Sequence, residues 1–132
     1  MDTLTHDNVP TSFGVFKPVG CVMLGLPTPT LLDTLVETLH GAGWPRDALR
    51  KFAPRETVPE LEAMIEGAGP LAGFGYEITM LRRYLALARE GCRWLLVTVD
   101  GTEQAAQVAE HARQVGARLA VHYRGLTIEE LI

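Results

Sequence analysis

The stretch WLLVTVDGTEQAAQVAEHARQVGARLAVHYR, residues 94–124, decides the fold because it holds a complete strand–helix–strand unit. Residues 94–99 form a short apolar run, which is typical of a buried strand. Residues 103–115 place small side chains along one side of a helix, and Gly116 supplies its stop. Residues 118–124 alternate apolar and polar side chains, which indicates a second strand with one more buried face.

An earlier part of the chain repeats this design. Residues 21–26, CVMLGL, are an apolar run and predict the first strand. Thr28 is placed to cap a helix, Pro29 suits its first turn, and the leucines within residues 31–39 give that helix an apolar side. Residues 49–53, LRKFA, predict a short second strand that carries two basic side chains. Two strand–helix–strand units are therefore expected.

The distribution of charge between these strands predicts their order in the sheet. The first strand of each unit is almost wholly apolar and belongs at the centre, whereas the second carries charge and belongs at an edge. This order is the split β-α-β, or ferredoxin-like, arrangement of an antiparallel α+β sheet. A doubly wound parallel α/β sheet is the alternative. Residues 127–130 have capping-box spacing and predict a short final helix.

The domain organisation follows from composition. Residues 15–132 are long enough for one domain with a sizeable core, and the polar residues 1–14 are expected to form a disordered tail. Residues 54–92 are a two-helix insertion between the second and third strands. Thr57 and Glu60 have the spacing of a capping box for the first inserted helix.

A glycine-rich loop joins the two inserted helices. Gly69, Gly73 and Gly75 leave a helix rather than a strand, and their spacing matches neither a P-loop nor a dinucleotide fingerprint. The helix predicted over residues 76–90 keeps its arginines largely off its packing stripe. A flexible turn between two helices is therefore the favoured interpretation. The alternative is that a mobile loop and an arginine-bearing helix close as a lid over a small anionic molecule.

Side-chain alternation assigns two faces to the sheet. One face packs under the two repeated helices and holds Val22, Leu24, Leu26, Leu95, Val97, Val99, Leu119, Val121 and Tyr123. The other holds Cys21, Met23, Gly25, Trp94, Leu96, Thr98, Ala120, His122 and Arg124. This second face is too apolar to be left in water, so either the inserted helices or a second copy of the protein must cover it.

Candidate ligand-binding residues gather around this mixed face. A half-buried histidine satisfied by a neighbour is the favoured interpretation of His122, and the alternative is a neutral imidazole that acts as a base or as the partner of an anion. The predicted binding set consists of His122, Trp94, Arg124, Tyr84 and Arg82. We identify no catalytic constellation, no metal-ligand spacing and no cofactor motif.

Composition and charge exclude several classes of function. The net charge of −4 excludes a broad phosphate-binding surface, so no nucleic-acid partner is expected. The apolar runs are too short to cross a bilayer, so no membrane association is expected. The two cysteines form neither a disulfide framework nor a zinc motif, which favours a cytoplasmic location.

Residues 31–56, LLDTLVETLHGAGWPRDALRKFAPRE, carry a resemblance to a known group. The helix, the Ala42-Gly43-aromatic turn and the Pro45–Leu49 link to a strand resemble the small bacterial general-stress (heat-induced stress) protein domain. The resemblance implies a small α+β domain without known chemistry and brings no catalytic residues. The mixed sheet face leads us to expect a non-enzymatic domain, which forms a homodimer or binds a small ligand through that face, and the resemblance implies a stress-related role. The alternative is an enzyme or anion-binding protein with a pocket between the mixed face and the insertion.

Overall fold

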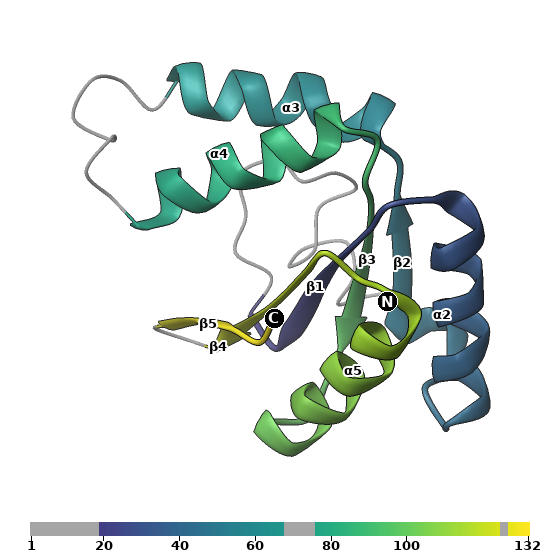
Figure 1. Cartoon of the computed structure of the whole chain (residues 1–132). Coiled ribbons are helices and arrows are strands. Elements are labelled where there is room, and N and C mark those ends of the chain that lie inside the picture. Colours follow the sequence, from purple (N-terminus) through teal and green to yellow (C-terminus); the bar gives the residue numbers. More distant parts are fainter. Residues whose placement is uncertain (1–18, 68–75, 125–126) are drawn as a thin grey trace.

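The computed structural model describes residues 19–67, 76–124 and 127–132, which form an α+β domain (Figure 1). Its strands are β1 (Cys21–Leu26), β2 (Leu49–Phe52), β3 (Arg93–Thr98), β4 (Leu119–Arg124) and β5 (Thr127–Glu130). Its α-helices are α2 (Pro29–Gly41), α3 (Pro54–Gly67), α4 (Tyr76–Arg89) and α5 (Thr102–Val115), and a 3₁₀ turn, η1, spans Arg46–Ala48. The predicted disordered tail and the glycine loop lie outside the described residues.

The strands form a single sheet in the order β2-β3-β1-β4-β5. All four neighbouring pairs are antiparallel, so the described strands exclude the doubly wound parallel alternative. The apolar strands β1 and β3 lie side by side, and β2 lies at an edge, as predicted. The prediction that β4 forms the other edge is wrong, because β5 pairs with its outer side.

Residues 127–130 form a strand, and the predicted final helix is wrong. Arg124 pairs with Thr127 and Val121 pairs with Glu130, which makes β4 and β5 a hairpin. A single helical turn fixes several backbone dihedrals for about one hydrogen bond, so an isolated turn is unfavourable. A hairpin instead gives the backbone groups along the outer side of β4 their partners.

Local capping signals set the ends of the helices that border the sheet. The Thr28 hydroxyl accepts a hydrogen bond from Leu31 N at 3.1 Å, which starts α2 where the sequence predicted. Gly116 ends α5 in the left-handed conformation, with φ of +95°. Helix α3 starts earlier than predicted: Ala53 N donates to Glu56 Oε1 at 3.0 Å, and Thr57 lies inside the helix. Pro54 suits the first turn because that position needs no backbone donor.

The sheet separates two hydrophobic cores, with α2 and α5 on one face and α3 and α4 on the other (Figure 1). The side chains of β1 and β3 face the cores that the sequence predicted. The predicted phase of β4 is wrong: Leu119, Val121 and Tyr123 lie in the core under α3 and α4, and Ala120 lies in the core under α2 and α5.

The register of the sheet explains this reversal. Met23 of β1 lies opposite Val121 of β4, and Val22 lies opposite His122. Directly opposed residues of antiparallel strands share a face of the sheet. Alternation within β4 shows which of its residues share a face, but pairing with β1 decides which face it is, because a slip of one residue reverses every side chain.

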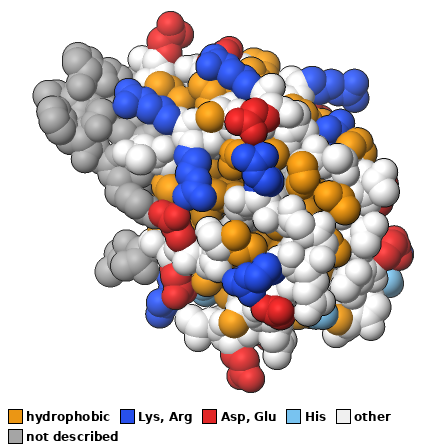
Figure 2. Space-filling view, in the orientation of Figure 1, with side chains coloured by type: hydrophobic (Ala, Val, Ile, Leu, Met, Phe, Trp, Pro, Cys, Tyr) orange, Lys and Arg blue, Asp and Glu red, His pale blue; other side chains and the backbone are white. Residues whose placement is uncertain are grey.

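The inserted helices cover the mixed sheet face. Leu61 of α3 and Met80 and Tyr84 of α4 are buried against side chains of β1 and β3. A sheet-to-sheet contact with a second copy is therefore not available on this face, and homodimerisation stays a prediction without that contact. Lys and Arg side chains are more numerous on the half of the surface that Figure 1 assigns to α3 and α4 (Figure 2).

Candidate binding pocket beside Trp44

Two residues of the predicted binding set, Trp94 and Tyr84, meet inside the core between the sheet and the insertion. Their ring centroids lie 5.5 Å apart at an angle of 61°. Trp94 is 0% exposed and Tyr84 is 2% exposed. Trp94 Nε1 donates to the Thr57 hydroxyl at 3.2 Å, and the hydroxyls of Tyr84 and Tyr123 are hydrogen-bonded at 2.5 Å. These side chains fill the region where the sequence predicted a ligand pocket.

The structure places His122 and Arg124 away from Trp94. His122 faces the α2–α5 side of the sheet because it pairs with Val22. Its Nδ1 lies 3.7 Å from Glu129 Oε1, which is too long for a hydrogen bond, and Arg124 Nη1 lies 3.7 Å from the same oxygen. Burial lowers the pKa of His122, while the charge of Glu129 opposes that shift.

The arginines of α4 lie on its exposed side, as predicted, but two of them have internal partners. Arg83 bonds to Glu130 of β5 at 2.7 Å, and Arg89 bonds to Glu62 of α3 at 2.6 Å. Arg82 is exposed on the same helix. The five predicted residues therefore do not converge on one site.

A pocket of about 300 Å³ lies at the opposite end of the sheet from the start of α2. Its walls come from the link between α2 and β2, from the end of β3 and from the first turns of α5. The lining residues that the structure describes are Ala42, Gly43, Trp44, Pro45, Ala48, Thr98, Asp100, Gln104 and Gln107.

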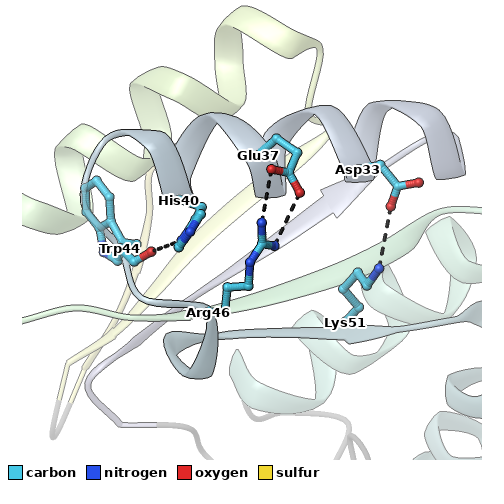
Figure 3. Close-up of polar contacts among 6 residues, drawn as sticks. All are labelled: Asp33, Glu37, His40, Trp44, Arg46 and Lys51. Carbon is cyan, nitrogen blue, oxygen red and sulfur yellow. Dashed lines mark hydrogen bonds and ion pairs between the residues drawn. The ribbon is translucent and has the colours of Figure 1, made fainter.

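The link between α2 and β2 holds Trp44 in this wall. Gly43 has φ of +117°, a conformation that favours glycine, and it lets the chain turn so that Trp44 N donates to Leu39 O at 3.0 Å. His40 Nδ1 donates to Trp44 O at 3.0 Å (Figure 3). Because a carbonyl oxygen only accepts, this bond places the hydrogen of His40 on Nδ1. The His111 ring of α5 meets Trp44 edge-on, with centroids 6.5 Å apart.

Ion pairs also connect η1 and β2 to α2. Arg46 bonds to both carboxylate oxygens of Glu37, at 3.2 and 3.3 Å, and Lys51 lies 3.5 Å from Asp33 (Figure 3). The hydrogen bonds from Arg46 hold the pKa of Glu37 below its usual range. These charged groups line a second pocket of about 250 Å³ with Val36 and Leu49, but they already pair with one another.

In the Trp44 pocket, by contrast, a buried hydrogen-bonding group of one lining residue has no partner in the described parts of the chain. Trp44 is 8% exposed, and its indole Nε1 is buried without a hydrogen-bond partner among the described residues. Gln104 Oε1 accepts from Asp100 N at 2.9 Å, which leaves the amide hydrogens of Gln104 as donors. Thr98, Asp100 and Gln107 are the other polar residues of the lining, and the Thr98 hydroxyl contacts Cys21 Sγ at 3.9 Å.

Two other buried polar atoms in the described parts of the chain also have no hydrogen-bond partner. They are Glu60 Oε1 and His122 Nδ1. Neither residue lines the two pockets described above. Trp44 is therefore the one residue of these three that both lines a described pocket and has an unpartnered buried polar atom.

Sequence reasoning treated Trp44 and Pro45 only as a turn and missed this pocket. Its lining comes from two stretches of chain, residues 42–48 and 98–107, which are separated by about fifty residues, and neither stretch carries a recognisable motif. The one local signal was a large aromatic residue in a glycine-rich link, where a surface turn has no need of such a side chain.

Comparisons with protein-family models, with curated proteins and with solved structures found no match. The resemblance to the general-stress domain, the stress-related role and the cytoplasmic location therefore stay predictions. Within the described ranges, no helix is long and apolar enough to cross a membrane. The same ranges contain no group of three or more His, Cys, Asp or Glu side chains that could hold a metal ion.

Proposed function

We propose that this protein is a non-enzymatic domain that binds a small polar ligand in the pocket beside Trp44. The observation that carries the proposal is that Trp44, whose buried Nε1 has no hydrogen-bond partner among the described residues, lines a pocket of about 300 Å³. Leaving a buried donor unsatisfied costs about 1–3 kcal/mol. A ligand acceptor that reaches Trp44 Nε1 would offset this cost and would bind more tightly for it.

The size and lining of the pocket support a ligand of this kind. Ligand pockets in proteins are roughly 300–1,000 Å³ and combine apolar walls with a few polar groups. Here Trp44, Pro45 and Ala48 supply the apolar walls, and Thr98 and Gln104 are among the polar groups. The volume restricts the ligand to a small molecule or to one group of a larger one.

Binding is favoured over catalysis by the titratable groups. Asp100 is the one titratable side chain among the described lining residues, so they form no acid–base pair. Burial raises the pKa of the Cys21 and Cys92 thiols, so both stay protonated at neutral pH and neither is an activated nucleophile. The enzymatic alternative placed its pocket where Trp94 and Tyr84 now pack.

The ferredoxin-like split arrangement belongs to the same proposal. The order β2-β3-β1-β4 and the antiparallel pairing support it, with α3 and α4 inserted between β2 and β3 and with β5 added to β4. An experimental structure in which β1 does not lie between β3 and β4 would contradict this fold assignment.

The ligand site can be tested by following the two indole N–H signals in ¹⁵N-labelled protein. The variant Trp94→Phe assigns the remaining signal to Trp44. We expect members of a library of small polar fragments to shift the Trp44 signal and to leave that of Trp94 in place. Trp44→Phe keeps an aromatic wall but removes the donor, and we expect it to weaken binding of the same fragments about fivefold or more. Because this variant lacks the Trp44 indole signal, its affinities are compared with those of the wild type through the backbone amide signals. The proposal fails if no fragment moves the Trp44 signal.

A further inference from the structure

We infer that the ligand of the Trp44 pocket carries a positively charged nitrogen, which Asp100 binds. The inference rests on the proposed function and adds the chemical class of the ligand. Among the nine lining residues that the structure describes, Asp100 is the one ionisable side chain, and none is basic. The one formal charge among the lining side chains is therefore negative.

Asp100 is held in place while its carboxylate stays available. Its backbone N–H donates to Gln104 Oε1 at 2.9 Å, which fixes the turn between β3 and α5. The residue is exposed, and both oxygens of a carboxylate accept hydrogen bonds. An ammonium or guanidinium group would find in it a charged acceptor, and charge-assisted hydrogen bonds are stronger than neutral ones.

The nearest basic residue of the link does not reverse this charge. Arg46 follows Pro45 in sequence, but its guanidinium bonds to both oxygens of Glu37 on α2 (Figure 3). It lines the second pocket rather than the Trp44 pocket. An anionic ligand would therefore meet Asp100 without a cation among the described lining residues.

The hydrogen-bond donors and the apolar side chains of the pocket indicate what else the ligand carries. Trp44 Nε1 and the amide hydrogens of Gln104 are donors, so they call for an acceptor on the ligand. Trp44, Pro45 and Ala48 offer apolar contact to its body. The expected ligand is a small organic amine or guanidine that also carries a hydroxyl or carbonyl oxygen.

Three probes with one aromatic body and different charges test this inference: tyramine, 4-hydroxyphenylacetamide and 4-hydroxyphenylacetate. Each is titrated at pH 7 and low salt while the Trp44 indole signal is followed. A charge at contact distance in water changes affinity about fivefold. We expect tyramine to bind at least about fivefold more tightly than the amide and the carboxylate to bind most weakly.

Two substitutions that each remove one carboxylate distinguish the role of Asp100 from that of the overall charge of the protein. Asp100→Asn should abolish the preference for tyramine. Asp47→Asn removes a carboxylate from η1 that does not line the pocket, and it should keep the preference. An unchanged order of the probes in Asp100→Asn, or an equal loss in Asp47→Asn, would overturn the inference.

The outcomes distinguish this inference from the proposed function. If the amide or the carboxylate shifts the Trp44 signal as strongly as tyramine, the charge preference is refuted and the binding site stands. If library fragments shift the Trp44 signal but no cationic fragment or probe shifts it, the inference about charge fails and the proposed binding site stands. If neither the three probes nor any fragment shifts it, both fail.

Discussion

Replacing Gly25 by alanine tests how closely β1 and β3 are packed. Gly25 lies opposite Trp94 in the sheet, and a Cβ atom built on it would lie 2.9 Å from Trp94 Cζ3. It would also lie 3.4 Å from Leu119 Cβ. Carbon atoms in good contact are about 3.5–4.0 Å apart, so the added methyl group forces the indole to move.

Trp94 has little freedom to move. It is fully buried, its Nε1 donates to Thr57, and its ring lies against Tyr84. Overpacking of a core in this way costs about 1–3 kcal/mol. With a urea m-value of about 2 kcal/mol/M, a loss of about 2 kcal/mol lowers the midpoint of urea unfolding by about 1 M.

Urea unfolding, followed by circular dichroism, measures this effect against a matched control. Gly41 ends α2 with open space around its Cα, so we expect Gly41→Ala to keep or slightly raise the midpoint. Phenylalanine lacks the Cζ3 atom of the indole, so Gly25→Ala should cost less in a Trp94→Phe background. A midpoint of Gly25→Ala at or above that of the wild type would refute the reasoning.

Three further predictions concern other parts of the fold. Because burial lowers the pKa of His122, the unfolded chain takes up a proton near pH 6.5 that the folded chain does not. Stability should therefore fall as the pH falls below about 6.5, and His122→Asn should flatten this dependence in urea midpoints measured between pH 7.5 and 5.5; an unchanged slope would contradict it. Leu61→Ala should destabilise the whole domain by about 2–5 kcal/mol in a single unfolding transition, because Leu61 is fully buried against the sheet, whereas an independent lid would leave the main transition in place. Gly116→Ala should cost about 1–2 kcal/mol in thermal unfolding, because φ at this position is +95°, and a melting temperature equal to that of the wild type would speak against the Gly116 turn.

The elements that the sequence predicted correctly are those with local causes. Thr28 and Pro29 start α2, and Gly116 ends α5, through contacts within a few residues of each position. The apolar runs of β1 and β3 are buried on both faces, so their central place required no knowledge of the register.

The features that the sequence did not predict depend on contacts between distant segments. The face of His122 is set by its pairing with Val22, one hundred residues earlier. Thr57 looked like a helix cap, yet its hydroxyl accepts from Trp94 across the core. The Trp44 pocket exists only where residues 42–48 meet residues 98–107, so no single stretch of sequence indicates it.

The way in which α3 and α4 cover the sheet limits how the chain can be shortened. Removal of both helices would expose Met23, Trp94 and Leu96 to solvent, and these side chains would form a continuous hydrophobic surface on the central strands. A trimmed protein joined from residue 53 to residue 93 would keep every strand and still precipitate or stick to itself, because such patches drive association. We therefore expect α3 and α4, which lie between β2 and β3 in the sequence, to prevent the sheet from associating with other copies through this face.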